Sequence, residues 1–186
     1  MRCRVREMTL DESRLMIRYF CEADADYLDG MGVDPARMPS QEVWFALLEE
    51  DFARPLPERD FYYLVWEVEG APIGHCNINK IEVGQQASMH LHIWEAKNRL
   101  SGRAPQLVQE SVVRFFEQFD LQQLYCEPYA LNPAPNRTLP KAGFRLVKTY
   151  ETMPGWITFL QPVNHWVLDR QTAMAAQTDP RSHTDS

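Results

Sequence analysis

Two segments of the sequence say most about the fold. They are His90-Leu91-His92-Ile93-Trp94-Glu95 and, shortly afterwards, Arg99-Leu100-Ser101-Gly102-Arg103-Ala104. They combine a strand with a glycine-containing loop that enters a helix. The N-terminus of a helix presents unpaired backbone N–H groups and the positive end of its dipole, so it binds anions. Gly102 lets the backbone approach a ligand closely, and small Ala104 avoids a clash. Positive charge comes from Lys97, Arg99 and Arg103. The sequence therefore predicts an anion site that would fit a pyrophosphate.

The helix that follows this loop has the clearest pattern in the chain. Pro105 stands in its first turn, where proline is tolerated because no backbone N–H is needed there. Apolar residues then recur at helical spacing, at Leu107, Val108, Val112, Phe115, Phe116 and Phe119. Before the loop, residues 61–68 are rich in aromatic and β-branched types and are followed by turn residues. We expect an antiparallel meander of this strand with strands at 73–81 and 87–95.

Shorter patterns complete the expected elements. An edge strand is expected at residues 2–9, a loop over 24–39, and helices after the N-caps Asp11 and Ser40. The second of these helices would bury Val43, Trp44, Leu47 and Leu48. Strands at 124–129, 144–151 and 165–170 and a short helix near Pro133 follow. This order predicts a single α/β (α+β) domain over residues 1–170 around one mixed sheet, with a flexible tail at 171–186.

Composition excludes several classes of protein. The 186 residues carry 26 acidic and 19 basic side chains, a net charge of −7, which argues against duplex nucleic acid as a partner. No apolar run approaches the roughly 18 residues that a membrane span needs, and no secretory signal is present. The four cysteines lack metal-site spacing, so we interpret them as reduced thiols. A cytoplasmic protein with no membrane partner is expected.

Together these motifs resemble the GCN5-related N-acetyltransferase (GNAT) superfamily. Its acetyl-CoA loop reads Q/R-x-x-G-x-G/A, matched here by Arg99-x-x-Gly102-x-Ala104. The segment from Asn132 to Phe144 resembles the fourth-helix signature, in which an Asn ends the fifth strand and Lys-x-Gly-Phe leads into the sixth. Pro72-Ile73-Gly74 resembles the entry of the third strand. The resemblance covers residues 4–170 and is closest to the RimJ/RimL type of ribosomal-protein acetyltransferase.

The resemblance implies a mixed, mainly antiparallel sheet of six to seven strands flanked by about four helices. Its fourth and fifth strands would splay apart and bind the pantetheine arm of acetyl-CoA, the acetyl donor, with no metal involved. The cofactor-binding residues so implied are the main chain of His92, Ile93 and Trp94, then Arg99, Leu100, Ser101, Gly102, Arg103 and Ala104 around the pyrophosphate, Asn132 and Asn136 beside the thiol arm, and Arg137 near the phosphates. An amine would then attack the thioester directly.

His90 is the first candidate for the base of that reaction. An imidazole with an ordinary pKa is largely neutral at pH 7, and Ser88, His90 and His92 share one face of the strand. In the arylalkylamine acetyltransferases of this superfamily, a histidine at the corresponding distance before the loop has this role. The alternative is that His90 and His92 are packed, hydrogen-bonded side chains. A metal site of His75, His90 and His92 is disfavoured because no carboxylate or cysteine is spaced to complete it.

Other proton-transfer groups are less well defined. Glu95, at the end of the strand, could relay protons through water; further candidates are Glu127, Tyr129 and Glu151. The family's usual acids are missing, since the Tyr position is Leu139 and the Ser position of the RimJ/RimL type is Pro135. A thiolate is a tolerable leaving group, so this loss need not stop the reaction. It nevertheless motivates an alternative, a non-catalytic CoA-binding regulator or scaffold of the same fold. A third possibility is an unrelated α+β binding domain.

The acceptor amine would lie near the first two helices and the last hairpin. Those segments contain acidic and aromatic residues, namely Asp24, Asp26, Asp29, Glu49, Glu50, Asp51, Tyr27, Trp44 and Trp156. Such groups suit a cationic amine, for example a polyamine, an aminoglycoside or a basic protein N-terminus. The alternative is that these charges are a solvated face. The protein is expected to be a monomer or a homodimer, with an exposed aromatic edge strand as a possible contact.

Overall fold

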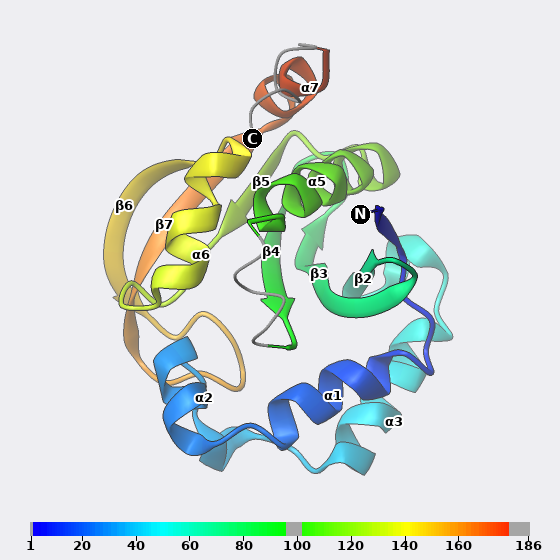
Figure 1. Cartoon of the computed structure of the whole chain (residues 1–186), viewed down its shortest axis with the longest axis vertical. Coiled ribbons are helices and arrows are strands. Elements are labelled where there is room, and N and C mark those ends of the chain that lie inside the picture. Colours follow the sequence, from blue (N-terminus) through cyan, green and yellow to red (C-terminus); the bar gives the residue numbers. More distant parts are fainter. Residues whose placement is uncertain (1, 96–101, 179–186) are drawn as a thin grey trace.

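The computed structural model describes residues 2–95 and 102–178, and within them seven strands form one sheet in the order β1-β2-β3-β4-β5-β7-β6. The strands are β1 (Cys3–Glu7), β2 (Phe61–Val68), β3 (Ala71–Glu82), β4 (Gln86–Ile93), β5 (Gln123–Cys126), β6 (Arg145–Thr152) and β7 (Gln161–Asp169). All neighbouring pairs are antiparallel except β4 and β5, which are parallel. The predicted fold class, a mainly antiparallel mixed sheet with flanking helices, is confirmed (Figure 1).

The helices lie on both faces of the sheet (Figure 1). They are α1 (Ser13–Cys21), α2 (Ala25–Met31), α3 (Gln41–Phe52), α5 (Ala104–Phe119), α6 (Pro133–Thr138) and α7 (Arg170–Thr178), with short 3₁₀ turns at Pro35–Arg37, Leu56–Glu58 and Pro140–Ala142. Ser40 caps α3 as predicted, because its hydroxyl accepts from the Val43 N–H. Among these helices none combines the length and the apolar character needed to cross a membrane.

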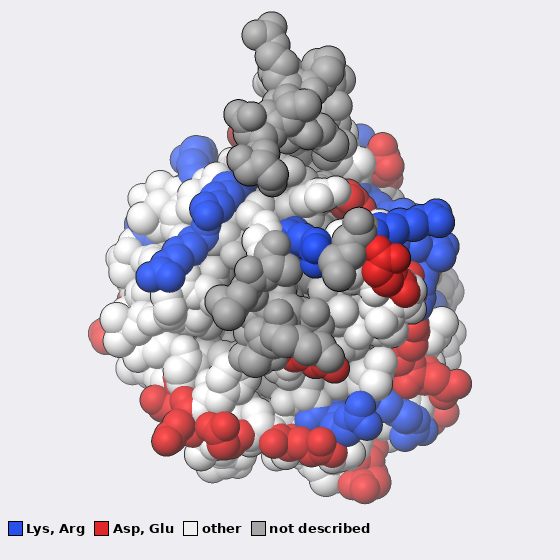
Figure 2. Space-filling model, in the orientation of Figure 1, with Lys and Arg blue, Asp and Glu red and all other residues white. Residues whose placement is uncertain are grey.

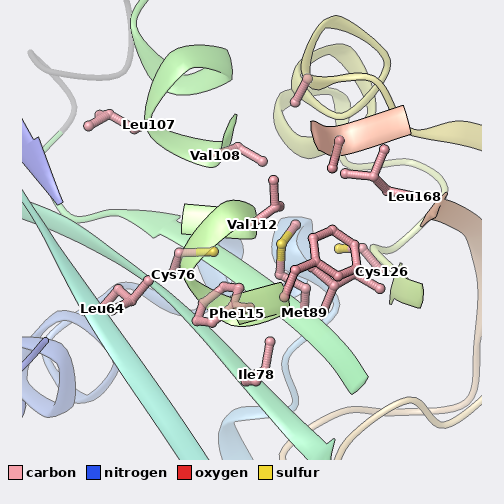
Figure 3. Close-up of a cluster of buried hydrophobic side chains, with 14 of the residues drawn as sticks. Leu64, Cys76, Ile78, Met89, Leu107, Val108, Val112, Phe115, Cys126 and Leu168 are labelled. Carbon is pink, nitrogen blue, oxygen red and sulfur yellow. The ribbon is translucent and has the colours of Figure 1, made fainter. Parts of the chain in front are cut away.

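Two apolar cores, one on each face, follow from the alternation of side chains along the strands. On β2, Leu64 and Trp66 pack toward α5, whereas Tyr63 and Val65 pack toward α1 and α3. The α5 core contains every residue of the predicted helical stripe, and Figure 3 shows Phe115 of α5 beside Met89 and Ile78 of the sheet. The helix after the anion loop therefore anchors one face of β4.

Four expectations differ from the structure. Asp11 does not cap the first helix, because Glu12 occupies the N-cap position of α1 and makes no side-chain cap bond there. Residues 24–39 contain α2, because Asp24 caps it by accepting from the Tyr27 N–H and Gly32, with φ 83°, ends it. On α3, Trp44 and Leu48 are buried, but Val43 and Leu47 are 53% and 50% exposed, since the helix contacts the core along a narrower line than predicted. Residues 171–178, expected within a flexible tail, form α7, whose Ala173 and Met174 pack against the α5 core.

The sheet opens between β4 and β5. The two strands pair through three residue pairs, and Ser88 opposite Tyr125 is the last of them. Beyond it β4 continues on β3, with Ile93 opposite Gly74, while β5 stays with β7. The two strands therefore part after Ser88 and Tyr125. This separation is the splay predicted from the resemblance.

Candidate active site

His90 lies on β4 where the splay begins. Its Nε2 is 3.1 Å from Asn79 Oδ1 on β3. An amide oxygen only accepts, so this bond places the ring proton on Nε2 and leaves the lone pair on Nδ1. Burial lowers the pKa of His90 to about 4, helped by the charge of Lys80 and opposed by that of Glu127. The imidazole is therefore neutral and oriented at pH 7, as a base must be, but it is a weak base.

His92 and Trp94 turn their side chains toward α1. The His92 ring lies 5.0 Å from the buried His75 ring and 4.9 Å from Phe20, and Trp94 Nε1 donates to His75 Nδ1 at 2.8 Å. Burial lowers the pKa of His75, so the His75 ring is neutral and accepts this bond. These side chains are packed and hydrogen-bonded, which leaves the main chain of β4 to border the splay.

One main-chain N–H at the end of β4 is used within the sheet. The Trp94 N–H donates to Ile73 O at 2.9 Å, so this N–H belongs to the β3 pairing rather than to a ligand. Backbone groups alternate in direction along a strand, so the N–H of Ile93 points to the opposite edge, toward the splay. The Trp94 N–H therefore faces β3 rather than the splay, and the cofactor-binding roles of the main chain of His92, Ile93 and Trp94 stay predictions.

The predicted anion loop is described only at its end. Arg99, Leu100 and Ser101, together with Lys97, lie outside the described residues. Gly102 has φ 70°, a left-handed conformation that glycine adopts without strain. Arg103 then occupies the N-cap position of α5, which starts at Ala104. The start of a long helix therefore follows directly from the end of the loop, as an anion site requires. Glu95 is exposed just after β4.

Asn132 and Asn136 both bond to the protein. Asn132 caps α6, because its Oδ1 accepts from the Ala134 N–H. Asn136 Nδ2 donates to Tyr129 O at 2.9 Å and to Asn132 O at 2.7 Å, and its Oδ1 accepts from Asn164 Nδ2 and Trp166 Nε1, each at 2.9 Å. Its hydrogen-bonding capacity is therefore used in joining the exit of β5 to α6 and β7. Arg137 is exposed in the last turn of α6.

Replacing Asn136 with alanine is expected to lower the free energy of unfolding by about 2 kcal/mol, because four polar groups lose their partner at once. Urea denaturation of the two proteins measures this difference. An Arg137→Ala variant on the same helix, where the side chain is exposed, is the control and should unfold like the wild type. Equal midpoints for Asn136→Ala and the wild type would show that solvent replaces these bonds fully.

Leu139 and Pro135 occupy the positions of the family's usual acids, as the sequence indicated. The Leu139 side chain is fully buried in the α5 core, where it supports α6 and can donate no proton. Among the other candidates, Tyr129 pairs by a single bridge with Val163, and Glu151 is exposed on β6.

A polar cluster beside the splay was only partly anticipated. Glu127 follows β5 directly, and its Oε1 accepts from His165 Nδ1 on β7 at 2.7 Å and from the Tyr150 hydroxyl on β6. Glu127 was among the sequence candidates, but His165 and Tyr150 were not. The only signal for them is that both are polar residues on predicted strands. Their meeting depends on β7 lying between β5 and β6, which sequence patterns do not reveal.

Some of the residues predicted to bind the acceptor are buried in the protein, and the others are exposed. Asp51 is 2% exposed and accepts from the N–H groups of Asp60 and Phe61, so it holds the chain before β2 and cannot meet a ligand. Trp44 is buried, with its ring 5.6 Å from that of Trp156 in the β6–β7 connection. The remaining carboxylates, Asp24, Asp26, Asp29, Glu49 and Glu50, are exposed. Figure 2 shows acidic side chains along the side of the molecule formed by α1 to α3.

Within the described part of the chain, the His, Cys, Asp and Glu side chains form no group that could hold a metal ion.

Comparison with known proteins agrees with this geometry. The family model described as an acetyltransferase (GNAT) domain matches residues 2–145. A search of curated proteins by sequence gave no match. Among solved structures, spermidine N-acetyltransferase from Vibrio cholerae in complex with CoA and spermine has a TM-score of 0.73 at 14% identity, covering 92% of this chain and 98% of that chain. Aminoglycoside acetyltransferase AAC(6')-Ib in complex with CoA and kanamycin has a TM-score of 0.70 at 16% identity, covering 95% and 100%.

Proposed function

The chain belongs to the GNAT acetyltransferase family, and from this premise we propose that it transfers the acetyl group of acetyl-CoA to the primary amine of a cationic acceptor. The observation that carries the proposal is the splay between β4 and β5, which begins after Ser88 and Tyr125, beside His90. The arrangement supplies a sheet edge for the pantetheine arm, a helix N-terminus for the phosphates and a neutral imidazole for the amine.

Each group of the site has one task in this reaction. Acetyl-CoA supplies an activated thioester carbonyl. The main chain of β4 along the splay would orient the pantetheine arm, and Gly102, Arg103 and Ala104 would face the pyrophosphate. His90 would take the proton that the amine loses as the N–C bond forms. Because the positions of the usual acids are Leu139 and Pro135, the departing thiolate would be protonated from solvent.

A cationic acceptor fits the charge of the molecule. Helices α1 to α3 cover the face of the sheet from which His90 projects, and α2 and α3 carry the exposed carboxylates. The rings of Tyr27 and Trp156 contact Tyr19 and Trp44 of this helical layer. Spermine and kanamycin, named with the two structural neighbours, are cationic amines. The resemblance to the RimJ/RimL type adds a protein N-terminus as an acceptor to be tested.

The decisive experiment combines binding with turnover. Acetyl-CoA is titrated into the protein by calorimetry, and released CoA is then measured with a thiol reagent in a panel of polyamines, aminoglycosides, basic N-terminal peptides and neutral or acidic amines. We expect acetyl-CoA to bind and the cationic amines to release CoA. Reaction with neutral or acidic amines alone would exclude the cationic acceptor.

The absence of the usual acids favours a second candidate, a CoA-binding protein without catalysis. Binding of acetyl-CoA with no release of CoA under any amine would support it. No binding at all would contradict both candidates.

A further inference from the structure

Glu127 and His90 stand at equivalent positions on the two sides of the splay. Ser88 and Tyr125 are the last parallel pair, so two residues further along each strand the side chains on the same face are His90 and Glu127. Their chain neighbours, Met89 and Cys126, lie in the α5 core. His90 and Glu127 therefore both project from the opposite face, where the acceptor is proposed to bind.

The Glu127 carboxylate is fixed by two donors from β6 and β7. His165 Nδ1 and the Tyr150 hydroxyl both bond to Oε1, and the Glu127 side chain is only 10% exposed. Bonds from two donors to one carboxylate oxygen restrict its position, so it acts as a fixed charge rather than a mobile surface group. Both bonds end on the same oxygen, which leaves Oε2 able to accept.

Other charged and titratable groups lie on β4 itself, on the strands of this part of the sheet and on α1. They are His75 and Lys80 on β3, His92 on β4, Tyr125 and Glu127 beside β5, Lys148 and Tyr150 on β6, and His165 on β7, with Tyr19 of α1 against His92. Lys80 disfavours the protonated form of His90, and Glu127 favours it. These two charges therefore set the strength of His90 as a base in opposite directions.

We propose that Glu127 is a positioning residue for proton transfer: its carboxylate, held by His165 and Tyr150, stabilises His90 when that imidazole takes a proton from the acceptor amine. The inference rests on the proposed function, in which His90 is the base. As the amine nitrogen forms its bond to the acetyl carbon, the C–S bond breaks and CoA leaves as the thiolate. The amine proton passes to His90 and from there to solvent, and solvent protonates the thiolate, so no other reactant is needed.

The coupling of the two groups can be measured without turnover. NMR titration of the His90 ring, assigned by its loss in His90→Gln, gives the pKa of His90 in each variant. Glu127→Gln keeps the size of the side chain but removes its charge, so we expect a lower pKa of His90. Glu82→Gln removes an equal charge from an exposed residue of β3 and should leave that pKa unchanged. An identical pKa of His90 in Glu127→Gln and the wild type would overturn the proposal.

The pKa of His90 has to be measured at pH values where the protein is folded. Lys80→Gln raises the pKa of His90 by removing the repelling charge, so the comparison is repeated in that background. The pKa of His90 in Lys80→Gln/Glu127→Gln should lie below that in Lys80→Gln alone. Circular dichroism of each variant at every pH confirms that folded protein is compared.

Turnover completes the test. With an amine that the wild type acetylates, Glu127→Gln should lower kcat at pH 7 about tenfold and change KM for acetyl-CoA less than about twofold, because it weakens proton transfer and not binding. Glu82→Gln should keep the wild-type kcat. An unchanged kcat in Glu127→Gln overturns this inference alone. If the wild type acetylates no amine, the proposed function fails, and the NMR comparison still decides whether Glu127 and His90 are coupled.

Discussion

Replacing His90 with glutamine is expected to lower kcat for amine acetylation about 100-fold while changing the Kd for acetyl-CoA less than about twofold. Glutamine retains a donor for Asn79 Oδ1, so the strand pairing around residue 90 is kept. It has no lone pair that can take a proton at pH 7, so the step in which the amine loses its proton is slowed. The thiol-release assay measures kcat, and calorimetry measures the Kd.

The matched control is Ser88→Ala. Ser88 Oγ lies 3.5 Å from His90 Nε2 on the same face of β4, so its removal disturbs the surroundings of the ring without changing the imidazole. Its kcat should stay within about twofold of the wild type. Unchanged turnover in His90→Gln would remove His90 from the mechanism and make Glu95, through a water molecule, the next base to test.

The pH dependence of turnover follows from the environment of His90. Burial lowers its pKa to about 4 from 6.5, so the ring loses its ability to accept a proton only near pH 4. We therefore expect kcat to be insensitive to His90 protonation between pH 5 and 8, under saturating substrates. The same shift makes the folded protein bind fewer protons than the unfolded chain between pH 4 and 6.5, so His90 contributes a loss of stability as the pH falls through that range. If kcat of the wild type instead falls as the pH drops through 6.5, and this fall is absent in His90→Gln, the predicted pH dependence is wrong.

The parts of the fold that sequence patterns predicted are those set by local chemistry. The apolar residues from Leu107 to Phe119 recur at helical spacing and form one buried helix face. Ser40 precedes a helix and caps it. Residues 24–39 contain α2 where the sequence predicts a loop. Asp24 and Gly32 cap and end this helix, and Asp and Gly are also the residue types that form turns. Short helices depend on such caps and carry too little periodicity to be recognised.

The candidate site could be predicted only along the strand that carries it. The choice of His90 follows from the pattern of β4 and from the resemblance to GNAT proteins, and the splay of the fourth and fifth strands follows from that resemblance; its position after Ser88 does not. The contact of Glu127 with His165 and Tyr150 joins three strands whose spatial order differs from their order in the chain. The commitment of the Trp94 N–H to Ile73 depends on the register of β3 on β4. Register and strand order are set by the packed sheet as a whole, which local patterns do not contain.

Gly74→Ala is expected to have the largest effect on stability, lowering the free energy of unfolding by about 3 kcal/mol. Gly74 lies on β3 opposite Ile93, the last paired residue of β4. A Cβ at this position would lie 2.3 Å from His92 O and 3.0 Å from Ile93 Cα, both of which are backbone atoms. Backbone in the middle of a sheet cannot turn aside as a flexible side chain can, so β3 and β4 must separate.

That separation reaches the site, because the strands would part where β4 borders the splay. Gly74→Ala should therefore also weaken acetyl-CoA binding at least about tenfold at a temperature where the variant is still folded, since the edge that carries the Ile93 N–H is displaced. Urea denaturation gives the stability and calorimetry the Kd. Gly30→Ala is the control, because a Cβ there meets no atom within 4 Å and the residue lies in α2, where alanine is the better helix former. Wild-type affinity in folded Gly74→Ala would mean that this edge of β4 does not hold the cofactor.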